Sequence, residues 1–131
     1  METYSLEFSV RDYECDIQGI VNNANYQHYL EHARHEFIKT AGLNFAELHL
    51  QGVDLVVAKV EMAFKTPLKS DDSFLVTVTM KKEGIRWIFM QDILRLPDRK
   101  MVVKARVDAV ALVNGKLTDY KPLEVAFGYK P

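Results

Sequence analysis

With 131 residues, the chain has the length of one domain that buries about two-thirds of its unfolded surface, and we expect residues 1–131 to form that single domain. Its 17 basic and 18 acidic residues give a formal net charge of -1 without a long basic run, which argues against a nucleic-acid partner. A secretion signal, an apolar stretch of about 20 residues and a second cysteine are all missing, so we expect a soluble cytoplasmic protein without integral membrane contact.

The first half of the chain predicts one strand followed by two helices. Residues 3–10 alternate between apolar and polar side chains, as in a half-buried strand. From Ala24 to Ala41, apolar residues recur every three or four positions, which predicts an amphipathic helix of about five turns that ends before Gly42. Asn44 then offers a second helix cap, with an acid three residues later, and predicts a short helix that Gly52 closes.

The second half of the chain predicts an antiparallel sheet. Four stretches alternate between apolar and polar side chains and are separated by short turns, at residues 54–64, 74–80, 85–96 and 101–113. In the first of these strands, Val56, Val60 and Phe64 are expected to share one face, and the strand itself is expected to be a free edge. In the last strand, the small side chains of Ala105, Ala109 and Ala111 leave room for the long helix to lie close across the sheet.

The loop before the long helix combines a carboxylate with a helix start. Asp16 lies in this loop, and Asn22 or Asn23 can accept a hydrogen bond from the first backbone amides of the helix. The helix start can stabilise a developing negative charge, and Asp16 can act as a nucleophile or a base. The alternative is that Asp16 is only a solvated loop residue. We interpret Cys15 as structural, because its acidic neighbour raises the pKa of a thiol and no histidine is near in sequence.

The same loop resembles the signature of a known family. The run Asp16-x-x-Gly19-Ile20-Val21-x-x-x-Asn25-Tyr26, preceded by Arg11 and Tyr13 and followed by Glu31 and Arg34, resembles the hotdog-fold acyl-CoA thioesterases, in particular the 4-hydroxybenzoyl-CoA thioesterase branch. The resemblance implies an α+β hotdog fold, in which a five-stranded antiparallel sheet wraps around a long central helix. It also implies a homo-oligomer, either a dimer or a dimer of dimers, with active sites at the dimer interface.

The resemblance further implies an activity and a set of site residues. The expected reaction is hydrolysis of an acyl-CoA substrate to free coenzyme A and a carboxylic acid, without a cofactor other than the coenzyme A of the substrate. Asp16 corresponds to the catalytic aspartate, and the backbone amide of Asn23 corresponds to the group that polarises the thioester carbonyl. The residues expected to contact the substrate are Tyr13, Gly19, Val21, Asn22 and Tyr26.

Other patterns admit weaker functional readings. His28, His32 and His35 have a spacing suited to zinc, but they lie opposite the apolar face of the helix, so we expect solvent or a subunit there and no metal. Glu31 is an alternative catalytic acid, although a salt bridge is the favoured interpretation. Three basic residues flank a hairpin turn and are candidates for contacts with the phosphates of coenzyme A, namely Lys81, Lys82 and Arg86.

Two other function classes remain open. A non-catalytic domain that binds acyl thioesters would keep the fold and the pocket without using Asp16 as a reactive group. A hotdog dehydratase or hydratase would need an acid paired with a histidine, and no histidine lies between Met1 and Tyr26. The triplet Val21-Asn22-Asn23 also resembles the acyl-carrier-protein thioesterases, but their motif has an asparagine and a histidine where this chain has Gln18 and Ile20, so hydrolysis of acyl-CoA is the favoured interpretation.

Overall fold

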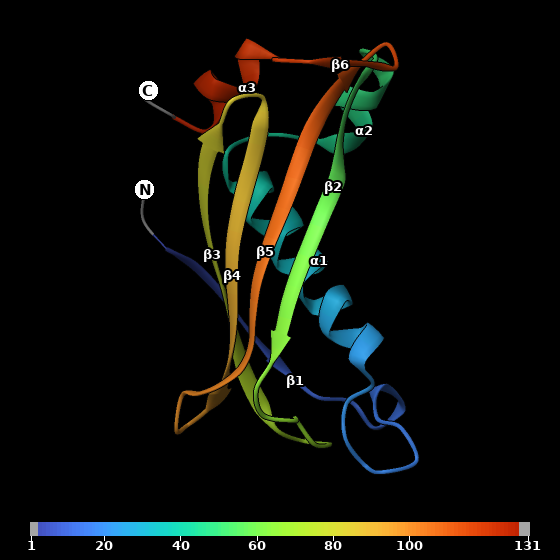
Figure 1. Ribbon diagram of the computed structural model, residues 1–131, viewed down its shortest axis with the longest axis vertical. Helices are drawn as coiled ribbons and strands as arrows, with labels where there is room; N and C mark the ends of the chain where they lie inside the picture. Colours follow the sequence, from blue (N-terminus) through green and yellow to red (C-terminus); the bar gives the residue numbers. More distant parts are fainter. Residues whose placement is uncertain (1–2, 129–131) are drawn as a thin grey trace.

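The computed structural model describes residues 3–128 as a curled antiparallel sheet with one long helix on its inner face (Figure 1). The helices are α1 (Asn23–Thr40), α2 (Phe45–Leu50) and α3 (Lys121–Ala126), with a short 3-10 helix, η1, at Asp12–Glu14. The strands are β1 (Tyr4–Ser9), β2 (Val53–Phe64), β3 (Ser73–Glu83), β4 (Arg86–Leu96), β5 (Lys100–Val113) and β6 (Lys116–Thr118). Their order is β1-β3-β4-β5-β2, and β6 pairs with the end of β5. The α+β arrangement implied by the family resemblance is confirmed.

Helix α1 begins and ends within a residue of its predicted bounds. The side chain of Asn22 accepts a hydrogen bond from the Ala24 amide at 3.0 Å, so Asn22 is the cap and Asn23 is the first helical residue. The residues of α1 that are buried against the sheet include Tyr26, Tyr29, Leu30, Ala33, Phe37 and Ile38. No helix among residues 3–128 has the length and apolar character needed to cross a membrane.

The core lies between α1 and the inner face of the sheet. Strand β3 contributes Phe74 and Val76, and β4 contributes Trp87 and Phe89, all at most 1% exposed. Tyr29 of α1 packs on Phe74 with 4.7 Å between the ring centroids. Such aromatic contacts hold α1 over β3 and β1, and the small side chains Ala105 and Ala109 of β5 belong to the same buried core as the apolar face of α1.

Strand β2 is a free edge of the sheet, as the sequence predicts. Its register with β5 shifts between Val57 and Lys59, which marks a β-bulge. On the two sides of the bulge, Val57 and Val60 both lie opposite buried inner-face residues of β5, whereas Val56 lies on the outer face. The prediction that Val56 shares a face with Val60 and Phe64 is therefore wrong, because the extra residue of the bulge reverses the alternation of side chains between the two faces of the sheet.

The sequence does not predict β6 and α3, which close one end of the core. The Lys82 ammonium group forms ion pairs with Asp119, at 2.6 Å, and with Glu124, and it lies 5.3 Å from the centroid of the Trp87 ring. Phe127, just after α3, packs on Trp87 with ring centroids 5.1 Å apart. The C-terminal segment is thus attached to the β3–β4 hairpin by both charge and aromatic packing.

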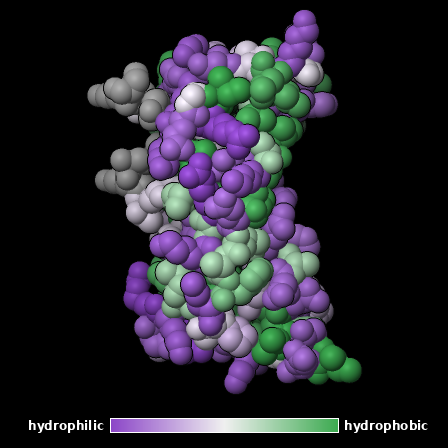
Figure 2. All heavy atoms as spheres, viewed as in Figure 1, coloured by the Kyte–Doolittle hydropathy of each residue, from purple (hydrophilic) through white to green (hydrophobic). Residues whose placement is uncertain are grey.

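The outer face of the sheet carries a network of charged residues. Asp108 is 2% exposed, and its carboxylate accepts hydrogen bonds from Arg86 at 3.0 Å and from Arg106 at 2.9 Å. Arg106 also pairs with Glu83 at 3.2 Å. Figure 2, which views this face, shows hydrophilic side chains over much of its upper half. The burial of Asp108 is compensated because both of its oxygens are paired.

Candidate active site

Asp16 opens a tight turn between η1 and α1. Its main-chain N–H donates to the Ile20 carbonyl at 2.8 Å, and the Gly19 N–H donates to the Asp16 carbonyl at 3.0 Å. Gly19 has a φ of +79°, which a residue with a side chain adopts only at a cost. The Asp16 carboxylate is half-buried, and its Oδ1 accepts a hydrogen bond from the Gln18 amide at 2.8 Å. Its Oδ2 makes no hydrogen bond to residues 3–128, so one carboxylate oxygen is available for chemistry.

The start of α1 presents an unbonded amide beside this turn. The N–H of Asn23 donates to no acceptor in the described part of the chain, whereas the Ala24 N–H is satisfied by the Asn22 side chain. A β-bridge between Cys15 and Val21 joins the two ends of the turn and holds it next to the helix start. Because the helix dipole adds positive potential at this point, the Asn23 amide is suited to hold a negative charge.

A buried carboxylate that sequence analysis missed anchors the helix start. Glu14 is 6% exposed, and it accepts hydrogen bonds from the main-chain amide of Arg11 at 2.8 Å and from the Arg11 guanidinium at 3.1 Å. Its carbonyl accepts from the Asn22 amide at 3.0 Å and from the Asn25 side chain at 2.8 Å. Burial by itself would raise the pKa of Glu14, but the hydrogen bonds from Arg11 together lower it. The three-residue spacing of Arg11 and Glu14 is the only sequence signal for this pair.

Tyr26 supports a pocket at the helix start. Its hydroxyl accepts a hydrogen bond from the Leu68 amide at 3.0 Å, and the Leu68 carbonyl accepts one from the Val21 amide at 2.8 Å. Burial raises the pKa of Tyr26, so its hydroxyl stays neutral. The pocket has a volume of about 240 Å³ and is lined by Ile20, Val21, Asn23, Tyr26, Phe64, Lys65, Thr66 and Pro67. Three of the predicted site residues, Val21, Asn23 and Tyr26, are therefore brought together.

Tyr13 lies apart from these residues. It is 76% exposed, the Arg11 guanidinium lies 5.3 Å from the centroid of its ring, and no hydrogen bond joins it to Asp16 in the described chain. It lines a second hollow, of about 670 Å³, on the side of α1 that carries His28 and Tyr29. Tyr13 and the pocket at the helix start thus lie on different sides of α1, and the other predicted site residues, Asp16, Gly19 and Asn22, line neither hollow.

The remaining candidates near the helix have clear environments. Burial and the neighbouring acids raise the pKa of Cys15, which supports its structural interpretation. His28 and His32 are exposed, whereas His35 is half-buried against an aromatic ring of α2. Among residues 3–128, no group of three or more histidine, cysteine or acidic side chains is arranged to hold a metal ion. The salt bridge predicted for Glu31 does not form within the described chain, where this residue is exposed.

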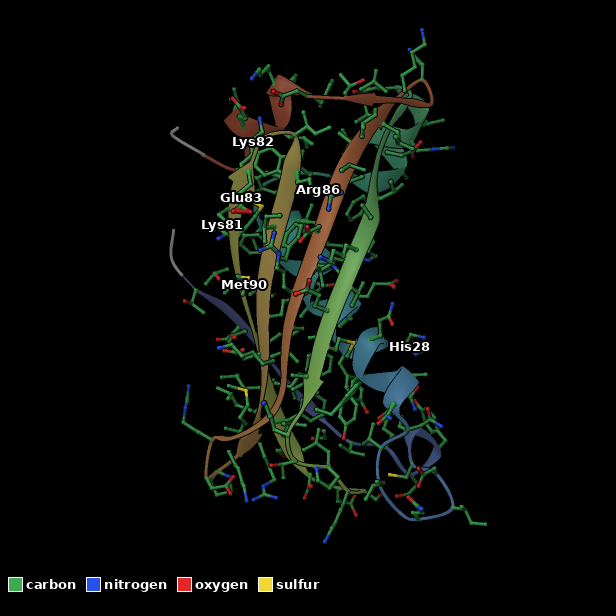
Figure 3. The ribbon with its side chains drawn as sticks, in the orientation of Figure 1. His28, Lys81, Lys82, Glu83, Arg86 and Met90 are labelled. Carbon is green, nitrogen blue, oxygen red and sulfur yellow. The ribbon has the colours of Figure 1, made fainter. Side chains whose placement is uncertain are left out.

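The basic hairpin residues lie toward the other end of the molecule. Figure 3 places Lys81, Lys82 and Arg86 around the upper end of β3 and β4, whereas the loop before α1 lies at the lower end in the same view. Lys81 pairs with Glu83 at 3.7 Å and Arg86 pairs with Asp108 at 3.0 Å. A phosphate contact by Lys82 would have to compete with its two ion pairs. Within one chain, these cations do not border the Asp16 turn.

Comparison with known proteins places the chain in a family. The family model described as the thioesterase-like superfamily matches residues 10–123. The chain belongs to this superfamily. This thioesterase-like protein is 36% identical over 125 residues to an acyl-acyl carrier protein thioesterase, ATL3, of Arabidopsis thaliana, an alignment that covers 95% of this chain and 64% of that protein. It is 33% identical over 116 residues to a putative esterase of Aquifex aeolicus, which covers 88% of this chain and 89% of the other.

Solved structures confirm the fold of this thioesterase-like protein. The 1,4-dihydroxy-2-naphthoyl-CoA thioesterase of Synechocystis superimposes with a TM-score of 0.89 at 17% identity, covering 99% of this chain and 100% of the other. The chain therefore has the hotdog fold. It spans slightly less than two thirds of the length of the two Arabidopsis relatives that it matches, at 64% and 63%.

Proposed function

We propose that this thioesterase-like protein hydrolyses acyl thioesters at the pocket beside the start of α1. The observation that carries the proposal is the unbonded amide of Asn23 at the start of α1, which the Cys15–Val21 bridge joins to the turn that holds the half-buried Asp16. A thioester carbonyl gains negative charge on its oxygen in the transition state, and one preorganised donor typically contributes about 3–4 kcal/mol there. The names of the plant relative and of the Synechocystis structure support the same reaction class.

In this mechanism, Asp16 takes a proton from water or attacks the carbonyl carbon itself. Its Oδ1 is held by the Gln18 amide, so the carboxylate has a defined orientation while Oδ2 is available. Thiolate is a good leaving group, and the reaction therefore needs no strong general acid and no cofactor beyond the carrier thiol of the substrate. The apolar wall formed by Val21, Tyr26 and Phe64 is suited to the acyl group.

We propose that the active unit is a dimer or a dimer of dimers, with the pocket closed by a second copy. The pocket borders the end of β2, the free edge strand, and Phe64 in its lining is 50% exposed. Pairing of two β2 edges across a two-fold axis would satisfy their backbone groups and cover this side chain. Sedimentation at micromolar concentration tests the assembly, and a stable monomer would contradict it.

We propose acyl-CoA as the substrate. The relatives' names include thioesterases that act on acyl carrier protein and on acyl-CoA, so the carrier requires a direct comparison. Contacts of Lys81, Lys82 or Arg86 with the phosphates of coenzyme A would have to come from a second copy, since these residues do not border the pocket of their own chain. Tyr13, Gly19 and Asn22 remain proposed substrate contacts around the turn.

Replacement of Asp16 by asparagine tests the reaction. Asp16→Asn keeps the hydrogen bond from Gln18 but removes the charge, so release of free thiol across a panel of acyl-CoA substrates is expected to fall at least about 100-fold. Binding of a non-hydrolysable thioester analogue is expected to change by less than about tenfold.

Asp71→Asn is the matched control. Asp71 is an exposed residue of the β2–β3 connection with a φ of +71°, a conformation that asparagine tolerates, and its replacement should leave hydrolysis unchanged. Equal rates for Asp16→Asn and the parent would refute the catalytic role. If the parent binds acyl-CoA and hydrolyses none of the panel, the non-catalytic binding domain is the correct reading.

A further inference from the structure

A buried arginine on α1 lacks a negatively charged partner within the described part of the chain. Arg34 is 7% exposed, and its Nη1 donates to the Gln91 side chain at 3.2 Å. The amide group of Gln91 donates in turn to the Leu30 carbonyl at 3.0 Å, so both polar groups of this neutral side chain are engaged. No carboxylate among residues 3–128 forms an ion pair with Arg34. Because an unpaired buried charge is strongly unfavourable, the environment of Arg34 is incomplete in the isolated chain.

The guanidinium group of Arg34 is not fully enclosed. No Arg34 atom is among the fully enclosed side-chain atoms of residues 3–128 that lack a partner, so the nitrogens other than Nη1 keep some exposure to solvent. Burial lowers the pKa of Arg34, and the negative charge of Glu31 acts in the opposite direction and raises it. Glu31 is itself exposed and forms no ion pair in the described chain. The opposite charges of Arg34 and Glu31 are thus both available for an ion pair with another molecule.

Both residues lie on the side of α1 that is turned toward the β2 edge. Tyr29 packs on Phe74 of β3, and Tyr26 packs on Phe64 of β2, which fixes the rotation of the helix on the sheet. Each residue advances about 100° around the helix axis. Measured from Tyr29 in the direction of Tyr26, Tyr26 lies at about 60°, Arg34 at about 140° and Glu31 at about 200°. Arg34 and Glu31 therefore face away from β1.

Arg34 is also level with the unpaired part of the edge strand. Its partner Gln91 lies opposite Ala105 of β5, and Ala105 lies opposite Met62 of β2. The neighbouring inner-face residue Phe64 is 50% exposed. The surface beside Arg34 thus combines open backbone groups, exposed apolar area and two charges of opposite sign, which together suit a second copy of this chain.

We propose that Arg34 forms an ion pair with Glu31 of the partner subunit, and that the reciprocal pair forms at the same time. This inference rests on the two-copy assembly proposed above. Helix α1 has 18 residues, Asn23–Thr40, so its centre lies between Glu31 and His32. Suppose that two antiparallel copies of α1 are related by a two-fold axis that passes between His32 and Ala33, one residue from that centre. Each Glu31 then lies opposite the partner's Arg34. A two-fold interface requires such self-complementary contacts.

The inferred contact has a consequence for the active site. Arg34 and Asn23 belong to one continuous helix, so a contact that fixes the middle of α1 against its partner also fixes the position of the Asn23 amide at the helix start. The pair therefore acts as a positioning contact, and neither charge needs to touch the substrate. Its loss should weaken association, and hydrolysis should fall as the fraction of dimer falls.

Charge reversal separates a contact between subunits from one within a helix. Glu31→Arg leaves only positive charges at positions 31 and 34, and Arg34→Glu leaves only negative ones, so neither variant can form the pair within its own helix. Each variant alone is expected to raise the dimer dissociation constant at least about 30-fold in sedimentation equilibrium. An equimolar mixture is expected to form heterodimers, with a dissociation constant within about threefold of the parent.

Controls keep the result interpretable. Glu36→Lys removes the intrahelical pair of Glu36 with Lys39, at 3.1 Å, and should leave dimerisation within about threefold of the parent. If Arg34→Glu does not fold, Arg34→Met with Glu31→Gln replaces it, and each of these is expected to weaken the dimer at least about tenfold.

Three outcomes would overturn the inference. Unchanged dimerisation of the single variants, or reversed variants that do not rescue each other, would show that Glu31 is not the partner of Arg34. Variants of Arg34 that raise KM for acyl groups bearing a carboxylate, without any effect on association, would assign the guanidinium to the substrate instead. If the parent protein is itself a monomer at micromolar concentration, the two-copy assembly fails, whatever the hydrolysis rate.

Discussion

Removal of a single oxygen at Tyr26 should destabilise the protein measurably. Tyr26 is 3% exposed, and its hydroxyl is the acceptor for the buried amide of Leu68, a residue that is 0% exposed. Tyr26→Phe leaves that N–H without a partner, which costs about 1–3 kcal/mol. For a chain of this length, about 3–5 °C of melting temperature corresponds to each kcal/mol, so the expected decrease is about 3–15 °C.

Calorimetry on Tyr26→Phe and Tyr13→Phe provides the comparison. The hydroxyl of Tyr13 makes no hydrogen bond to the described chain and its side chain is 76% exposed, so Tyr13→Phe should change the stability by less than about 0.5 kcal/mol. Hydrolysis should also fall in Tyr26→Phe, because the Leu68 carbonyl binds the Val21 amide at 2.8 Å beneath the helix start. Equal melting temperatures for the two variants would show that Tyr26 does not support this segment through its hydroxyl.

Two further predictions concern stability. Gly52→Ala should destabilise by about 1–2 kcal/mol in urea unfolding, since Gly52 has a φ of +80° and the Asn114 side chain must turn aside for an added Cβ. Gly84→Ala, at a φ of +59° with open space, should lose no more than Gly52→Ala, and a larger loss would contradict this reasoning. The hydrogen bonds of Asp108 with two arginines lower its pKa in the folded protein below its ordinary value of 3.8. The contribution of Asp108 to the stability of the fold is therefore fully present above about pH 4 and is lost as the pH falls through this lower pKa. Asp108→Asn should remove that part of the pH dependence and cost about 1–3 kcal/mol at neutral pH.

Local signals in the sequence were sufficient for most of the fold. Period-two and period-3.6 patterns identify β1 to β5 and α1, and the caps Asn22 and Asn44 both accept the hydrogen bonds expected of them. The bulge in β2 escapes such reasoning because Leu55, Val56 and Val57 are all apolar, so the alternation does not show which residue is the extra one. Segment 116–126 has no clear period, and its position depends on contacts with distant residues of the β3–β4 hairpin.

The candidate site was predictable only where its parts are close in sequence. The turn at Asp16 and the helix start at Asn23 are seven residues apart, and both follow from local rules for turns and caps. The roles of Glu14 and Tyr26 depend instead on burial and on a partner elsewhere, Leu68 in the case of Tyr26. No local pattern shows that Tyr13 lies on the other side of the helix start from the pocket.

The two edges of the sheet differ in length, and this difference bears on how copies of the chain can add to one another. β1 has six residues, whereas β2 has twelve and contains a bulge. If β2 of one copy joined β1 of the next, no more than six residues would pair, and the addition could repeat without limit. Two β2 strands that meet each other can pair over a longer stretch and leave no β2 edge open. Strand length by itself thus favours a closed assembly over a growing fibre.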